Sequence, residues 1–150
     1  MSAAPHARPP ADQPALARFE EWRERARRSA AASGRRQIEA LEETSGLAAD
    51  RFVDELGALL RLGVLHMRQL DGYAPDFLQV PFAEAARRRC IALRSPEGLL
   101  CVAVDDPFND ELLAWLDAAI AGAFELRLVH PGDLAAYLAR HEESLSALDA

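Results

Sequence analysis

The sequence predicts an α+β fold, in which an N-terminal helical subdomain precedes an α/β sandwich with a small mixed sheet and a ββαβα order of elements. Three patterns support this prediction. Apolar residues recur at helical spacing between residues 15 and 63. The apolar runs CIALR and LLCVAV are joined by SPEG, a turn containing proline and glycine. The run FELRLV then alternates apolar and charged residues, as a half-exposed strand does.

Changes in composition divide the chain into three segments. Residues 1–14 contain four prolines and few large apolar residues, so we expect a disordered lead there. Residues 15–63 form the predicted helical subdomain, and residues 64–150 form the predicted α/β subdomain. Half of the 150 residues are hydrophobic, which is enough to bury a core.

Three helices are expected in the helical subdomain. The first covers residues 15–33 and ends at Gly34, because glycine readily takes the left-handed conformation found at helix ends. Its acidic residues come early and its arginines late, as the helix dipole favours. The second and third helices are expected within residues 35–46 and 48–63, where Gly63 closes the third.

The α/β subdomain begins with the short run VLHM, residues 64–67, which is a candidate strand. A helix is predicted over PFAEAARRR, with Pro81 at its first position. LLCVAV does not alternate, which is typical of a central strand covered on both faces. Its connection through a helix to FELRLV predicts a right-handed parallel crossover. A last helix is expected from about Asp133.

The composition excludes several classes of function. The chain contains arginine but no lysine, so it lacks the lysine of P-loop nucleotidases, Schiff-base enzymes and protein kinases. Residues 37–150 carry an excess of acidic residues over arginine, which argues against nucleic acid as the main ligand. No apolar run approaches the ~20 residues that span a bilayer. The N-terminus has no segment of the signal-peptide type, and a cytoplasmic location is therefore expected.

The two cysteines are expected to be small core residues. If CIALR and LLCVAV form a hairpin around SPEG, Cys101 faces Ala92 and Cys90 lies on a diagonal from it. A diagonal pair is about 7–8 Å apart at Cα, beyond the reach of a comfortable disulfide.

Asp105 and Asp106 are a candidate catalytic carboxylate pair, since they follow a buried strand. Neighbouring residues of a strand point to opposite sides, however, and no histidine lies nearby in the sequence. Asp106 precedes a proline, which favours the extended geometry of a helix N-cap. We therefore interpret the pair as the end of a strand and the start of a helix. The four histidines show no metal-ligand spacing, and no metal site is expected.

The first helix carries the candidate partner-binding surface. An apolar stripe on this helix is too narrow for a self-sufficient core helix, and it lies beside a run of arginines. Tryptophan and arginine often dominate protein interfaces. The candidate partner-binding residues are Leu16, Phe19, Trp22, Arg23, Arg25, Arg27 and Arg28.

Residues 76–116 contain a Leu-x-Val-Ala-x-x-Asp-Pro core, from Leu100 to Pro107. Further matching features are Gly46–Leu47, the run FVDELGALLRLGVL and the run FELRLVHPGDLAAYLARH. With these features, residues 35–140 resemble the N-terminal (MshEN or GspE N-terminal-like) domain of type II secretion and type IV pilus assembly ATPases. This domain is also found in some membrane glycosyltransferases.

The resemblance implies a non-catalytic module that docks an ATPase or a transferase onto inner-membrane partners. In some members of the family the helical part binds cyclic di-GMP, through an Arg-Leu-Gly opening and a closing glutamine. In this sequence the opening falls on Gln37, Ile38 and Glu39, and the closing position falls on Leu60. The arginine, the glycine and the glutamine are therefore absent. The candidate residues for phosphate contacts are Arg35, Arg36 and Arg51.

The leading hypothesis is a regulatory or adaptor module without enzymatic activity, cytoplasmic or peripheral to the inner membrane. Its expected partner is a protein at the cytoplasmic face, in a secretion ATPase assembly or a glycosyltransferase. No cofactor is expected. The alternative is a cyclic di-GMP sensor with a degenerate site. An acid–base hydrolase using Asp105 and Asp106 is the weakest hypothesis.

Overall fold

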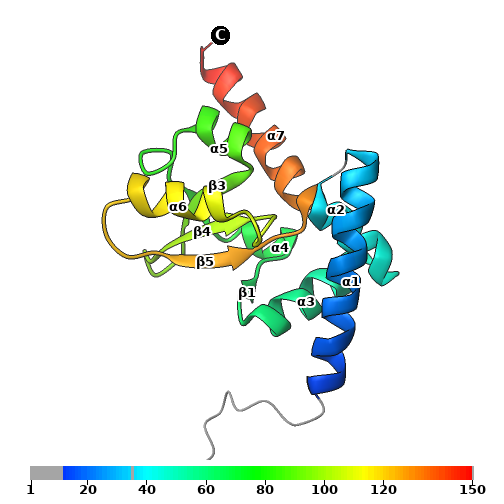
Figure 1. The fold of residues 1–150 in the computed structure, drawn as a ribbon. Helices are drawn as coiled ribbons and strands as arrows, with labels where there is room; N and C mark the ends of the chain where they lie inside the picture. The colour runs from blue at the N-terminus through cyan, green and yellow to red at the C-terminus, as the bar shows by residue number, and fades with distance from the viewer. Residues whose placement is uncertain (1–11, 35, 150) are drawn as a thin grey trace, which may run out of the picture. The chain divides into compact units, whose positions relative to one another are not determined.

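The computed structural model describes residues 12–34 and 36–149 (Figure 1). The chain divides into two compact units between Ala48 and Ala49. Helices α1 and α2 belong to the first unit, and all later elements belong to the second. The boundary expected from the sequence, between residues 63 and 64, lies further along the chain. The helix after Ala48 is thus part of the same unit as the sheet.

The described part of the first unit contains two helices that pack against each other, α1 (Asp12–Ser33) and α2 (Gln37–Ser45). Helix α1 begins three residues before its expected start, inside the predicted disordered lead. Pro14 lies in its first turn, where a missing N–H is tolerated. The expected end is confirmed, since Gly34 has a φ of +73° and its N–H donates to Ala30 O at 2.8 Å. The rest of the predicted lead lies outside the described residues.

The second unit is built on a five-stranded mixed sheet with the order β1-β5-β4-β3-β2. The antiparallel hairpin of β3 (Cys90–Arg94) and β4 (Leu100–Val104) and the parallel pairing of β4 with β5 (Glu125–Leu128) are both as expected. Two strands of two residues each extend the sheet, with β1 (Gly63–Val64) parallel to β5 and β2 (Ala74–Pro75) antiparallel to β3. The predicted α+β class is confirmed.

Five helices accompany this sheet in the described part of the second unit: α3 (Ala49–Leu60), α4 (Met67–Leu70), α5 (Phe82–Arg88), α6 (Asp110–Ala119) and α7 (Pro131–Asp149). Helix α4 was not predicted from the sequence. Pro81 is the N-cap of α5 rather than its first residue. Pro131 occupies the first position of α7, two residues before the expected start.

Helix α3 ends at Leu60, earlier than expected. Arg61 takes the left-handed conformation, with a φ of 60°, and Leu62 N–H donates to Gly57 O at 2.9 Å. This turn ends the helix, and β1 begins directly after it at Gly63. The following segment passes very close to the helix here: a Cβ built on Gly57 would lie 2.9 Å from the backbone oxygen of Leu62 and would clash with Cγ2 of Val64. A glycine at this position is what lets α3 and β1 pack together.

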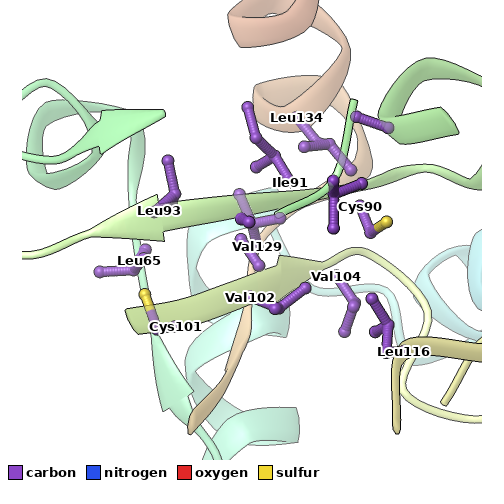
Figure 2. Close-up of a cluster of buried hydrophobic side chains, with 14 of the residues drawn as sticks. Leu65, Cys90, Ile91, Leu93, Cys101, Val102, Val104, Leu116, Val129 and Leu134 are labelled. Carbon is purple, nitrogen blue, oxygen red and sulfur yellow. The ribbon is translucent and has the colours of Figure 1, made fainter. Parts of the chain in front are cut away.

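Side chains from both faces of the sheet form the core of the second unit. Strand β4 is buried along its whole length, which confirms the predicted central strand. Figure 2 shows Leu134 of α7 near Ile91, and Leu116 of α6 near Val104. Ile91 and Val104 point to opposite faces, because Ile91 pairs with Ala103 and successive strand residues alternate.

The two cysteines are buried and free, as expected, but their register differs from the prediction. Cys101 pairs with Leu93, because the loop between the strands spans residues 95–99 and the last pair is Arg94 with Leu100. Cys90 is three positions from Leu93, an odd number, so the two thiols lie on opposite faces of the sheet. Burial raises the pKa of Cys90 to about 12 and raises the pKa of Cys101 as well.

Candidate functional site

The apolar stripe of the proposed partner-binding helix is largely used within the protein. Phe19 is only 3% exposed, and Ala26 and Ala30, on the same side of α1, are buried as well. Trp22 is partly buried, and the side chain of Leu16 lies outside the described residues. The stripe is therefore a packing face at Phe19, and Trp22 is the only described aromatic residue of the stripe with exposed surface.

The arginines of α1 differ in their contacts. Arg23 is partly buried, whereas Arg25, Arg27 and Arg28 are exposed. Arg27 donates to Glu24 Oε2 at 2.7 Å, one turn away on the same helix. Within the part of the chain that the structure describes, Arg25 and Arg28 make no hydrogen bond or ion pair. These two guanidinium groups are the polar groups of the predicted surface that are available to a partner.

The candidate phosphate-binding arginines lie in different units. Arg36 precedes α2 in the first unit, and its backbone N–H donates to Glu39 Oε1 at 3.4 Å. Arg51 is exposed on α3 in the second unit, where it donates to Glu55 Oε2 at 3.2 Å. Arg35 lies outside the described residues. Glu39, which stands at the position of the family's glycine, is exposed and used as a helix-capping residue.

Asp105 and Asp106 have separate structural roles. Asp105 is 1% exposed and accepts a hydrogen bond from Arg89 Nε at 2.8 Å. Asp106 Oδ1 accepts from the N–H of Phe108 at 3.0 Å, in a turn that ends the strand. Asp105 is thus part of a half-buried ion pair and Asp106 part of a backbone turn, and the two carboxylates do not form a shared acid–base site.

The N-cap of α6 is Asn109 rather than Asp106. Asn109 Oδ1 accepts from Leu112 N–H at 3.0 Å, and the helix begins at Asp110. The prediction of Asp106 as the cap was wrong because the turn from Asp106 to Asn109 separates the strand from the helix. Asn and Asp are about equally good caps, so the sequence alone does not decide between the two positions.

Two surface hollows lie in the second unit. One, of about 390 Å³, is lined by Leu113, Asp117, Gly122, Ala123, Phe124 and Leu126. The other, of about 250 Å³, is lined by Asp71, Tyr73, Tyr137, Arg140, His141 and Ser144.

The smaller hollow is held together by its own side chains. Arg140 donates to Asp71 Oδ1 at 2.9 Å and lies 5.5 Å from the centre of the Tyr137 ring. Burial raises the pKa of Tyr137, and burial and Arg140 lower the pKa of His141. His141 lies against the Tyr137 ring, at 4.5 Å between ring centroids. These contacts tie α7 to the end of α4.

A further cluster, formed by Asp50, His66 and Asp133, was not predicted from the sequence. These residues are far apart in sequence, so their spacing carries no recognisable ligand motif. The one local signal is the pair Asp50 and Asp54, which lie one turn apart on the same face of α3.

Comparison with known proteins gives a family and two similar structures. The MshEN domain family matches residues 60–148, more than half of the chain. A structure of MshE with cdg has a TM-score of 0.58 at 23% identity, over 81% of this chain and 88% of that chain. The N-terminal domain of XpsE has a TM-score of 0.54 at 20% identity, over 89% and 97%. At these identities the two structures establish a shared fold, and no curated protein matches the chain significantly.

Among the described residues, no helix is both long enough and apolar enough to cross a membrane.

Proposed function

Because the chain belongs to the MshEN domain family, we propose that it is a non-catalytic regulatory or adaptor module. Its partner is a protein at the cytoplasmic face of the inner membrane, in a secretion, pilus or polysaccharide-synthesis system. The family match begins at residue 60 and covers the α/β part of the chain. Helix α1 lies outside this match, and we assign to it the selection of the partner.

The observation that carries this assignment is the pair of exposed arginines Arg25 and Arg28 on α1, which have no partner among the described residues. They are three positions apart and therefore neighbours on the helix surface. Trp22 presents its remaining exposed surface three positions before Arg25. Exposed arginines beside an aromatic residue suit an acidic segment of a protein, whose carboxylates a guanidinium binds in a bidentate manner.

Charge reversal on α1 tests this proposal. The double variant Arg25→Glu/Arg28→Glu should reduce binding of the purified chain to inner-membrane vesicles by at least about tenfold, or roughly 1.4 kcal/mol. The matched control is Arg61→Glu/Arg68→Glu, which changes the net charge equally at two exposed arginines of the second unit. Binding is measured by co-sedimentation at several salt concentrations, and salt should weaken it.

Two outcomes would contradict the proposal. Equal losses in both double variants would mean that only the net charge of the chain matters. Binding that survives protease treatment of the membranes, or that is reproduced by protein-free anionic vesicles, would point to lipid rather than to a protein partner.

The alternative function, a cyclic di-GMP sensor, is favoured by the structure of MshE with cdg. In this chain, Gln37, Ile38 and Glu39 replace the family's opening motif, and Glu39 places an exposed carboxylate where a dianionic ligand would approach. We therefore expect calorimetric titration with cyclic di-GMP to give a dissociation constant weaker than about 1 μM. A tighter dissociation constant that Arg36→Ala or Arg51→Ala weakens would establish the sensor function instead.

A further inference from the structure

One imidazole and three carboxylates gather in the second unit. Ligand atoms of Asp50, His66 and Asp133 all lie within 4.8 Å of one another. Asp54 contacts the same imidazole. Asp50 and Asp54 come from the first half of α3, His66 directly precedes α4, and Asp133 lies in the first turn of α7. Three separate segments of the chain thus bring their polar groups to one place.

The two ring nitrogens of His66 have different surroundings. Nε2 lies 2.8 Å from Asp54 Oδ1, a hydrogen bond in which Nε2 carries the proton and the carboxylate accepts. In the neutral ring, Nδ1 then has a free lone pair. Nδ1 faces Asp50 Oδ1 at 3.5 Å, which is longer than the ~2.7–3.2 Å of an N–H···O hydrogen bond. Two acceptor atoms that face each other in this way leave room for a cation between them.

The distance between these two atoms suits a metal ion. Two ligands of a tetrahedral zinc ion, with bonds of about 2.1 Å, lie about 3.4 Å apart. A carboxylate that accepts the other N–H of a ligating histidine is the usual second partner of such a ring, because it fixes the tautomer and the orientation. Asp54 stands in that place. The backbone of His66 is also fixed, since its N–H donates to Gln69 Oε1 at 2.8 Å.

No arginine neutralises this cluster within the described part of the chain. Among the described residues, Asp50 and Asp54 form ion pairs only with His66. Asp133 is partly buried and has no hydrogen bond or ion pair to any residue that the structure describes. The dipole of α7 favours a negative charge at Asp133, but it supplies no donor to the carboxylate oxygens. His130, three residues earlier, does not offer Nδ1 to the cluster, because this atom accepts from Gly132 N–H at 2.9 Å.

We propose that Asp50, His66 and Asp133 bind a zinc ion, and that Asp54 orients His66 for this purpose. One imidazole nitrogen and two carboxylate oxygens suit zinc better than magnesium or calcium, which prefer oxygen ligands alone. Three protein ligands leave a fourth position for water or for a group of another molecule. The bound ion would link α3, the segment before α4 and α7.

The test is titration of the metal-free, full-length chain with zinc chloride by calorimetry. We expect one zinc ion per chain, a dissociation constant of about 10 μM or tighter, and a higher Tm with zinc than without it. Asp133→Asn should weaken binding at least about tenfold and remove the zinc-dependent shift in Tm. The matched control is Asp110→Asn, which removes the same charge from the first turn of α6 and should bind zinc normally.

A second measurement identifies the histidine. Zinc should shift the ¹⁵N resonance of Nδ1 in the His66 ring, while the rings of His130 and His141 stay unchanged. The proposal is overturned if zinc binds more weakly than about 100 μM, if Asp133→Asn binds as tightly as the unsubstituted chain, or if magnesium binds as tightly as zinc. The last outcome would mean that the carboxylates only collect counter-ions.

Discussion

Arg89 and Asp105 show how one residue joins a helix end to a buried strand end. Arg89 ends α5 in the left-handed conformation, with a φ of 60°. Its guanidinium donates to Asp105, whose side chain is almost fully buried. A buried carboxylate that loses a charged donor is left with part of its desolvation cost uncompensated. The ion pair therefore contributes to stability by compensating for the desolvation of Asp105.

We predict that Arg89→Met destabilises the protein by about 1–3 kcal/mol. Arg87→Met is the control, since Arg87 is exposed and pairs with Glu84 at the surface, where an ion pair contributes at most about 1 kcal/mol. Urea denaturation monitored by circular dichroism measures both effects. Equal losses in the two variants would show that burial of Asp105 does not matter.

Cys90 gives a prediction for alkaline pH. Burial raises the pKa of this thiol from 9.0 to about 12, so between these values the folded protein keeps a proton that the unfolded chain releases. Stability from this group is therefore complete below pH 9 and decreases as pH rises toward 12. Between pH 8 and pH 10 the unsubstituted chain should lose about 1 kcal/mol more than Cys90→Ala. Urea denaturation at each pH measures the free energy of unfolding. An equal loss of stability in the two proteins would contradict the raised pKa of Cys90.

At the scale of elements, the start of α6 depends on one side-chain acceptor. Asn109 satisfies the N–H of Leu112, and Asp110 and Glu111 then lie at the favourable end of the helix dipole. Loss of a cap exposes an unpaired N–H and typically costs about 0.5–2 kcal/mol.

Asn109→Ala should therefore lower the free energy of unfolding by about 1 kcal/mol, whereas Asn109→Asp, which keeps an acceptor, should leave it nearly unchanged. Thermal denaturation of the two variants measures the difference. If the aspartate variant lost as much stability as the alanine variant, the cap would not be the reason for the effect.

At the scale of the whole molecule, the division between Ala48 and Ala49 separates the functions that we propose. The second unit contains the sheet, its core and the family match. The first unit contains α1 with Arg25 and Arg28. A unit with its own core can fold alone.

Residues 49–150 should consequently fold cooperatively by themselves and lose most of the affinity for the membrane-associated partner. Circular dichroism and thermal denaturation monitor the folding, and the vesicle assay monitors the binding. An unfolded fragment would mean that α1 and α2 belong to a single core with the sheet. A folded fragment with full affinity would place the interface in the α/β part.

The sequence determined those features that depend on neighbouring residues. Gly34 ends α1 because a left-handed residue is needed there, and the unbroken apolar run of β4 predicts a strand covered on both faces. The motif from Leu100 to Pro107 also predicted the family, which the match over residues 60–148 confirms. Local geometry and apolar periodicity depend on residues that are close together in the sequence, so they can be interpreted without knowledge of the fold.

Only the tertiary structure decided which distant groups meet. The two-residue strands β1 and β2 exist because β5 and β3 pair with them, and their own sequences are too short to carry a strand pattern. Phe19 is a packing residue rather than a free anchor because its surroundings bury it. His66 meets Asp50 and Asp133 only after α3 and α7 pack into one unit. Contacts between residues far apart in the chain depend on how the helices and strands pack, and no pattern within a single segment specifies that packing.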